Sequence, residues 1–383
     1  MNGSPPERWI ERALAPPRAF GAPLGRGRLR VAPEDFLVEE DLGFAPSGIG
    51  SHVLLKVRKR NANTDWVARE LARAAGCRPH DVGYAGLKDR RAVTIQWFTV
   101  PLPRRSRAAR EETGAATLHE GAAHENSAVG AVPAGTNAVS DLATLRGTDF
   151  EVLEAHAHAR KLPRGALAGN RFTIRIRDVD APEAVLAERL EAISRTGVPN
   201  YFGPQRFGRG GANLGKITRD IDAIHPRERS YILSAARSLI FNAVLAERVA
   251  EGSWYRLESG DVANVDARGS VFPVEAVDET LRERAARLEI HPTGPLWGGD
   301  EPLTAGRICA LEERVAAEFE DASALVIAAG MRHERRSLRL AVRELEWTCE
   351  GRDLVVRFWL TKGSYATTVL RELLDAEGDE EGG

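Results

Sequence analysis

The chain has 383 residues, enough for two domains and a sizeable hydrophobic core. Its 53 Lys and Arg are matched by 55 Asp and Glu, and the net charge of −2 excludes binding of nucleic acid through a globally basic surface, so any such surface must come from local clusters. The start lacks an apolar signal core, no run of about 18 apolar residues occurs, and the three cysteines lie far apart. We therefore expect a cytoplasmic protein with no membrane span and no metal site.

The first predicted elements are strands between residues 28 and 57, interrupted by a PEDF turn at 33–36. A basic cluster ends the second strand and consists of Lys56, Arg58, Lys59 and Arg60. Such a cluster is either a solvated face, the commoner case, or a contact for phosphate. The next segment predicts a helix that is capped by Thr64, buries Val67 and Leu71, and ends at Gly76.

Residues 83–98, GYAGLKDRRAVTIQWF, predict two strands joined by the loop LKDRR. The loop presents Asp89 at a strand end among Lys88, Arg90 and Arg91, whose positive field favours the ionised carboxylate and attracts phosphate. A carboxylate in a basic loop suits attack on, or proton removal from, a polyanion. On these residues alone, a hairpin loop with merely solvated charges is the commoner outcome.

The composition changes after Val100. Residues 101–147 are rich in Ala, Gly, Glu and Ser and show no sustained apolar period, so we expect a flexible insertion over 104–147. Regular structure is expected to resume at residue 150. His156 and His158 lie two residues apart and could share a strand face, but no third metal ligand is near.

The segment GNRFTIRI predicts another strand, in which Phe172 alternates with polar residues and is either a core aromatic or a base-stacking one. Asn170, two residues before Phe172, carries an amide that can both donate and accept hydrogen bonds.

A helix is predicted from Pro182 to Gly197, followed by GVPNYFGPQRFGRGGANLGKIT. Gly210, Gly215 and Lys216 nearly match a nucleotide-binding loop, but Ile217 replaces the required Ser or Thr and no strand precedes it, which disfavours an ATPase. The segment is otherwise architectural or an RNA contact, in which Arg206 and Arg209 would offer guanidinium groups to phosphate.

The last part of the chain predicts helices within 229–290 and at 308–319, with a tight loop GPLWGG at 294–299. Two antiparallel strands follow around residues 350–352, and a loop then leads into a short helix near Tyr365. Tyr365 is either a substrate-site aromatic or a packing residue at the helix start.

Several of these segments together resemble the TruD family of tRNA pseudouridine synthases. Its G-x-K-D-x-x-A-x-T-x-Q signature stands at residues 86–96, its P-E-D-F segment at 33–36 and its G-N-x-F motif at 169–172. The block G-V-P-N-Y-F-G-x-Q-R-F-G matches residues 197–208, and the closing G-S-[FY]-A-T pattern matches 363–367. The resemblance covers nearly the whole chain except the first 25 or so residues, the insertion and the acidic tail.

The resemblance implies an α+β fold: a pseudouridine-synthase catalytic domain with a mixed, mostly antiparallel sheet, plus an inserted family-specific α+β domain. The expected bounds are 26–196 with 339–383 for the catalytic domain and 197–338 for the inserted one. The implied catalytic carboxylate is Asp89. The implied substrate contacts are Phe36, Asn170, Phe172 and Tyr365. The residues that would support the site or contact RNA are Arg30, Lys88, Arg206 and Arg209.

The implied reaction converts a uridine of tRNA, at position 13 by family analogy, to pseudouridine without a cofactor. Asp89 would act either as a nucleophile on the sugar or base, or as a base that deprotonates the ribose. The expected partner is tRNA, and the chain is expected to act as a monomer. The alternative is a non-catalytic RNA-binding protein or RNA chaperone on the same scaffold, which the presence of Asp89 argues against.

Overall fold

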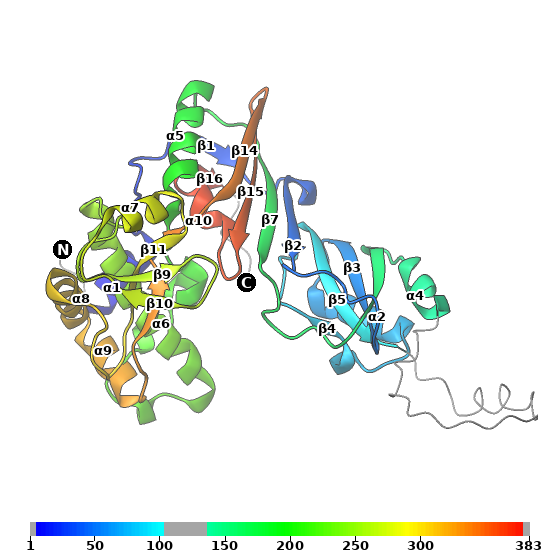
Figure 1. The fold of residues 1–383 in the computed structure, drawn as a ribbon, viewed down its shortest axis with the longest axis horizontal. Helices are drawn as coiled ribbons and strands as arrows, with labels where there is room; N and C mark the ends of the chain where they lie inside the picture. Colours follow the sequence, from blue (N-terminus) through cyan, green and yellow to red (C-terminus); the bar gives the residue numbers. More distant parts are fainter. Residues whose placement is uncertain (1–4, 103–135, 378–383) are drawn as a thin grey trace, which may run out of the picture. The chain divides into compact units, whose positions relative to one another are not determined.

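The computed structural model describes residues 5–102 and 136–377, and the described chain forms two compact units (Figure 1). Of the described residues, those from Arg30 to Ile174 form one unit, and those up to Leu29 combine with those from Arg175 onward to form the other. We call them the 30–174 unit and the second unit. The domain bounds expected from the sequence, 26–196 with 339–383 and 197–338, stay a prediction.

The 30–174 unit is built on strands of one sheet in the order β7-β2-β5-β3-β6, with the short β4 paired to β5. Strands β2 and β5 run parallel, whereas their other neighbours in this run are antiparallel. The strands are β2 (Phe36–Asp41), β3 (His52–Arg60), β4 (Gly83–Tyr84), β5 (Val93–Pro101), β6 (Phe150–His158) and β7 (Gly169–Ile176). Helices α2 (Thr64–Ala74) and α4 (Thr136–Ala143) and short turns η1 (Pro33–Asp35) and η2 (Pro79–Asp81) complete the unit. The predicted α+β class with a mixed, mostly antiparallel sheet is confirmed.

Helix α2 buries Val67 and Leu71 in the core of this unit, as its apolar spacing predicts. The predicted cap was wrong, because Asn63 precedes the helix and Thr64 is its first residue. The side chain of Thr64 is buried and is used to hold the loop that carries Asp89, as described below.

The expected flexible insertion was wrong for residues 136–147, which include helix α4. Leu142 is buried in the core of the 30–174 unit, and Val139 and Leu145 pack against the same cluster. The three residues lie three positions apart, and a pattern of only three apolar residues does not stand out from the Ala- and Gly-rich sequence around it. The rest of the predicted insertion, 104–135, lies outside the described residues.

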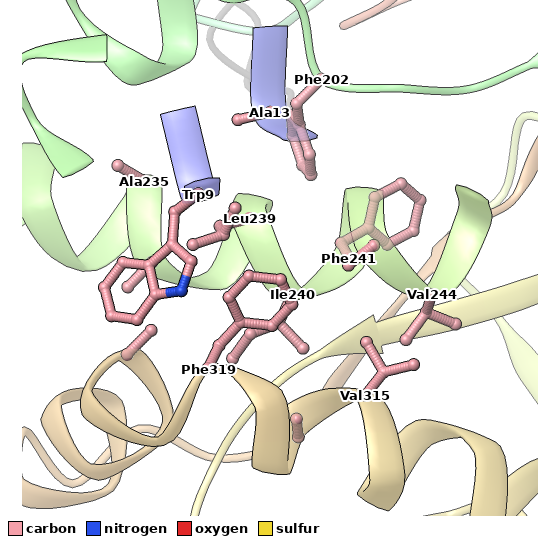
Figure 2. Close-up of a cluster of buried hydrophobic side chains, with 14 of the residues drawn as sticks. Trp9, Ala13, Phe202, Ala235, Leu239, Ile240, Phe241, Val244, Val315 and Phe319 are labelled. Carbon is pink, nitrogen blue, oxygen red and sulfur yellow. The ribbon is translucent and has the colours of Figure 1, made fainter. Parts of the chain in front are cut away.

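The second unit is organised around α6 (Pro226–Ala250), a long helix that is buried on most sides. Ile240, Phe241 and Val244 of α6 share one buried cluster with Val315 and Phe319 (Figure 2). Trp9 of α1 (Pro5–Leu14) belongs to the same cluster, and its ring centre lies 5.9 Å from that of Phe319. Helices α8 (Gly306–Glu318) and α9 (Glu320–Ala328) also pack against α6, and the unit further contains α5 (Glu183–Thr196), α7 (Glu279–Ala286) and α10 (Ala366–Leu370). Helix α5 ends at Gly197, whose φ of +72° favours glycine, as predicted.

The strands of the second unit form four groups. One sheet has the order β10-β9-β11-β12, with β9 (Val262–Val265), β10 (Val271–Pro273), β11 (Ile290–Leu296) and β12 (Glu334–Ser337). The pairs are β14 (Arg343–Glu350) with β15 (Asp353–Thr361), β1 (Arg26–Arg28) with β16 (Asp375–Glu377), and β8 (Val198–Pro199) with β13 (Arg339–Leu340). The predicted antiparallel hairpin around 350–352 is confirmed by β14 and β15. The predicted GPLWGG loop was wrong in its first half, because Gly294–Leu296 belong to β11.

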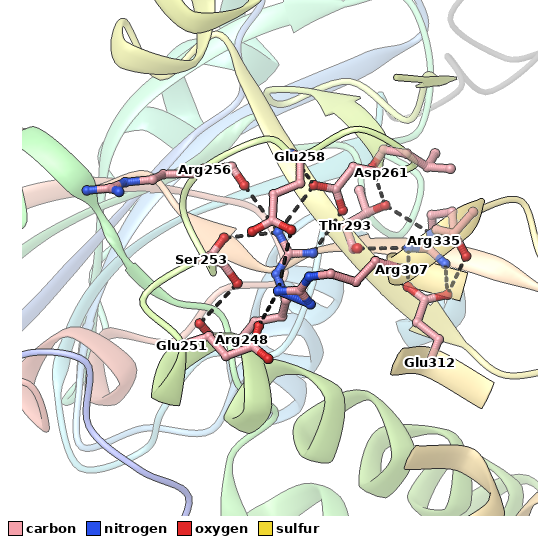
Figure 3. A network of polar contacts seen from close by, with 12 residues as sticks. Arg248, Glu251, Ser253, Arg256, Glu258, Asp261, Thr293, Arg307, Glu312 and Arg335 are labelled. Carbon is pink, nitrogen blue, oxygen red and sulfur yellow. Dashed lines mark hydrogen bonds and ion pairs between the residues drawn. The ribbon is translucent and has the colours of Figure 1, made fainter. Parts of the chain in front are cut away.

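Two buried ion pairs link α6 and α8 to the sheet of this unit (Figure 3). Arg248 of α6 donates to both carboxylate oxygens of Asp261, at 2.9 and 3.2 Å, and both side chains are almost fully buried. Arg335 of β12 pairs in the same way with Glu312 of α8, at 2.7 and 2.8 Å. Because each guanidinium also donates to main-chain carbonyls or a hydroxyl, the buried charges are hydrogen-bonded as well as paired.

Candidate active site

Asp89 lies in the loop between β4 and β5 and is presented to solvent. Its side chain is 56% exposed, and its Oδ2 accepts a hydrogen bond from Nη2 of Arg30 at 3.0 Å. Arg30 is mostly buried, with 17% of its side chain exposed. The arrangement orients Asp89 while it leaves the carboxylate open to a ligand.

Arg30 connects Asp89 to two aromatic rings. Its guanidinium carbon lies 4.2 Å from the centre of the Phe36 ring, and Phe36 meets Phe172 edge-on with ring centres 6.3 Å apart. The backbone of Arg30 has a φ of +54°, a conformation that costs an L-residue roughly 1 kcal/mol and persists only where surrounding contacts hold it. The structure thus brings Arg30, Phe36, Phe172 and Asp89, all predicted site residues, into one cluster.

Asn170 lies on β7 opposite Glu40 of β2 and is 8% exposed. Its Oδ1 atom is buried and accepts no hydrogen bond from the described residues. A buried acceptor without a donor costs about 1–3 kcal/mol, so it calls for an explanation such as a ligand that supplies the donor.

Lys88 is held inside the protein beside Asp89. Its Nζ lies 2.7 Å from Oε1 of Glu40, and both side chains are buried. The other oxygen of Glu40 accepts the N–H of Trp97 on β5 at 2.9 Å. The ammonium of Lys88 is therefore engaged with a fully buried carboxylate. Its role as support or RNA contact stays a prediction.

A second set of hydrogen bonds fixes the loop backbone. The hydroxyl of Thr64 accepts the N–H of Lys88 and donates to Oε1 of Gln96, each at 3.1 Å. The Nε2 of Gln96 then donates to the carbonyl of Gly86 at 2.6 Å. Helix α2 and strand β5 therefore clamp both sides of the loop that carries Asp89. The sequence analysis did not predict that Thr64 and Glu40 support this loop. The presence of Gln96 in the same motif as Asp89 was the one indication that Gln96 holds the loop.

Lys59 makes the most direct contact with the backbone of Asp89. Its side chain is fully buried, and Nζ donates to the carbonyl of Asp89 at 3.1 Å and to that of Ala62 at 2.7 Å. In the sequence, Lys59 belongs to the basic cluster that ends β3, which suggested a surface role. Strand alternation turns Lys59 inward, whereas the exposed Arg58 and Arg60 pair with Glu151 and Glu34.

The burial of Lys59 predicts a pH-dependent stability. Desolvation lowers the pKa of Lys59 to about 8, an effect that Asp89 and Glu40 oppose and Lys88 reinforces, whereas the ordinary value is 10.5. Between pH 8 and pH 10.5 the unfolded chain binds more protons at Lys59 than the folded protein does, so the free energy of unfolding rises with pH. Below about pH 8 Lys59 is charged in both states, and the full cost of burying its charge lowers the stability of the fold.

We expect the free energy of unfolding of the wild type, measured relative to Lys59→Met, to increase by about 2 kcal/mol between roughly pH 7.5 and pH 9.5. Denaturant unfolding of both proteins at the two pH values checks this, and the subtraction removes the titration of all other groups. An identical difference at both pH values would show that the pKa of Lys59 is not lowered.

The remaining predicted site residues lie in the second unit. Tyr365 directly precedes α10 and is 39% exposed. Arg206 is half-buried in the turn η3 (Pro204–Phe207) and donates to the hydroxyl of Ser234 at 3.0 Å, whereas Arg209 is exposed. Among residues 5–102 and 136–377, no helix is both long and apolar enough to cross a membrane.

Comparison with known proteins first defines the fold. The crystal structure of a putative tRNA pseudouridine synthase D (TruD) from Methanosarcina mazei is similar to this structure with a TM-score of 0.66, covering 98% of each chain at 20% sequence identity. The two proteins therefore share a fold.

The sequence comparisons then define the family. The family model of tRNA pseudouridine synthase D (TruD) matches residues 21–130, 131–221 and 212–373. The tRNA pseudouridine synthase D of Nitrosococcus oceani is 43% identical over 364 residues, 93% of each chain, and that of Methylococcus capsulatus is 43% identical over 94% of each chain. The chain belongs to the TruD family.

Proposed function

We propose that the protein is an isomerase that converts a uridine of tRNA to pseudouridine, at position 13 by family analogy, with Asp89 as its catalytic carboxylate. The observation that carries the proposal is the position of Asp89, which is half-exposed yet bound by Arg30, whose guanidinium in turn lies over the ring of Phe36. The same sheet also carries Phe172, which meets Phe36 edge-on, and the buried amide oxygen of Asn170, which lacks a donor. Family membership supplies the substrate class, because the relatives are named tRNA pseudouridine synthases.

The reaction balances without a cofactor. The bond between C1′ and N1 of uridine breaks, the uracil turns, a bond forms between C1′ and C5, and the hydrogen on C5 leaves as a proton while N1 gains one. A single carboxylate can serve this sequence as a nucleophile on the sugar or base, or as a base that removes a proton from the ribose. Arg30 would hold the carboxylate in place during either route.

The neighbouring side chains suit a uracil that has left its stack. The free Oδ1 of Asn170 can accept the N3–H of the base, which would satisfy the buried acceptor. Phe172 would be an aromatic contact whose stacking offsets the few kcal/mol that base flipping costs. A tRNA partner and a cytoplasmic location belong to the same proposal.

Shortening Phe172 should weaken catalysis more than folding. Phe172→Leu keeps most of the apolar volume but removes the ring, so we expect kcat/KM for tRNA to fall by about 10- to 100-fold, the value of one stacking contact. Phe98→Leu, a change in a fully buried ring of the same unit, is the matched control for core disruption. A kcat/KM of Phe172→Leu no lower than that of the control would remove Phe172 from the substrate site.

Release of tritium from tRNA labelled at C5 of uridine tests the reaction, because pseudouridine formation expels that hydrogen. The proposal predicts release by the wild-type protein in the absence of any added cofactor. A protein that binds the tRNA but releases no tritium would instead be an RNA-binding protein or RNA chaperone.

A further inference from the structure

Two arginines of the second unit share one aromatic ring. The guanidinium carbon of Arg336 lies 4.2 Å from the centre of the Phe202 ring, and that of Arg206 lies 5.0 Å from it. Phe202 is fixed in turn by α6, because its N–H donates to Asn242 at 2.9 Å and its carbonyl accepts from the same amide at 3.0 Å. The ring therefore provides a rigid platform for two positive charges.

Neither arginine is neutralised. Arg336 donates to the amide oxygen of Asn200 at 2.7 Å and Arg206 to the hydroxyl of Ser234, so the acceptors that they use are uncharged. Within the described parts of the chain, neither guanidinium forms an ion pair, and the buried Nε of Arg336 donates no hydrogen bond. By contrast, Arg237, Arg248 and Arg335 of the same unit each face a carboxylate.

The electrostatic environment shows that the two charges act on one another. Burial, and next the positive charge of Arg206, lower the pKa of Arg336 to about 10, while Tyr365 opposes this shift. Arg336 therefore still carries its charge at neutral pH, and both side chains remain partly accessible. Two close, uncompensated cations are unfavourable until an anion binds, and Arg forks match the oxygens of phosphate.

We propose that Arg206 and Arg336 form a phosphate-binding site that takes a phosphodiester of the RNA backbone. The inference rests on the proposed function, since it assigns the ligand from the RNA substrate. It explains how a chain with a net charge of −2 can hold a polyanion, through a local pair of unpaired guanidinium groups rather than a basic surface.

The dissociation constant of tRNA, measured at several salt concentrations, tests the site. We expect Arg206→Gln and Arg336→Gln each to weaken binding about three- to tenfold and to reduce the slope of log K against log salt by about 0.7–0.9, the value of one lost phosphate contact. Arg219→Gln is the matched control, because it removes the same charge from an exposed arginine that already pairs with Glu320 and Asp321.

Two further measurements separate the outcomes. Inorganic phosphate should compete with tRNA for binding to the wild type, and it should compete less well for either variant. If phosphate competes in this way but the salt slopes of the variants equal that of the wild type, the site binds free phosphate, and the assignment to RNA is overturned. Thermal unfolding identifies a variant that has lost its fold, in which case the other variant decides. If both folded variants match Arg219→Gln, the phosphate site is wrong, whereas the proposed function fails only if the wild type releases no tritium.

Discussion

Replacing Asp89 by Asn should lower pseudouridine formation by at least about 10⁴-fold, because the amide can neither attack nor take up a proton as the carboxylate does. Asn has nearly the same shape, and Asp89 is half-exposed, so the fold should not change. The affinity for tRNA should also stay within about threefold of the wild type, since sequence-independent contacts to phosphate supply most of it. Single-turnover rates and filter binding with the same tRNA measure the two effects.

The control for this substitution is Asp149→Asn, which removes an exposed carboxylate from the same unit. It should leave the rate unchanged. If Asp89→Asn instead lost tRNA affinity in proportion to its rate, Asp89 would be a binding residue. A rate equal to that of the wild type would exclude Asp89 from the chemistry altogether.

The largest expected effect on stability comes from Asp261→Asn. This change leaves the buried guanidinium of Arg248 without a counter-charge, and removing one partner of a buried ion pair costs about 3–5 kcal/mol. Asp261 also accepts the N–H of Glu258 at 2.7 Å, and an amide oxygen can keep this bond, so the loss reports mainly on the charge. Chemical denaturation gives the change in the free energy of unfolding.

Glu318→Gln provides the comparison, because Glu318 pairs with Arg12 and Arg314 at the surface. Surface pairs of this kind are worth less than about 1 kcal/mol. An Asp261→Asn protein as stable as Glu318→Gln would show that Arg248 does not depend on Asp261 for its burial.

Most helices and strands were predictable because the spacing of their apolar residues matches the face that each element buries. Leu186, Leu190 and Ile193 of α5 are buried at helical spacing, and the alternation in β7 buries Phe172, Ile174 and Ile176. Gly197 marked the end of α5 because few other residues adopt its backbone conformation. In these cases local pattern and tertiary packing agree.

The supports of the candidate site were not predictable in the same way. Thr64 has the residue type of a helix cap, yet its hydroxyl is turned to the Asp89 loop and to Gln96. Lys59 looked like one of several surface cations, and only the pairing of β3 with β5 and β6 shows that it points inward. The missing donor at Asn170 depends on neighbours from distant segments, which no local pattern records. Similarly, Arg206 and Arg336 lie far apart in the sequence, and the fold brings both of them to the ring of Phe202.

Chemical mapping of pseudouridine in a tRNA transcript tests the central claim most directly. The transcript is incubated with the wild type or with Asp89→Asn, treated with a carbodiimide that labels pseudouridine, and read by primer extension. We expect one new stop, corresponding to position 13, with the wild type and none with the variant. Pseudouridine formed by both proteins, or by neither on a transcript that is shown to bind, would contradict the proposal that Asp89 carries out this reaction.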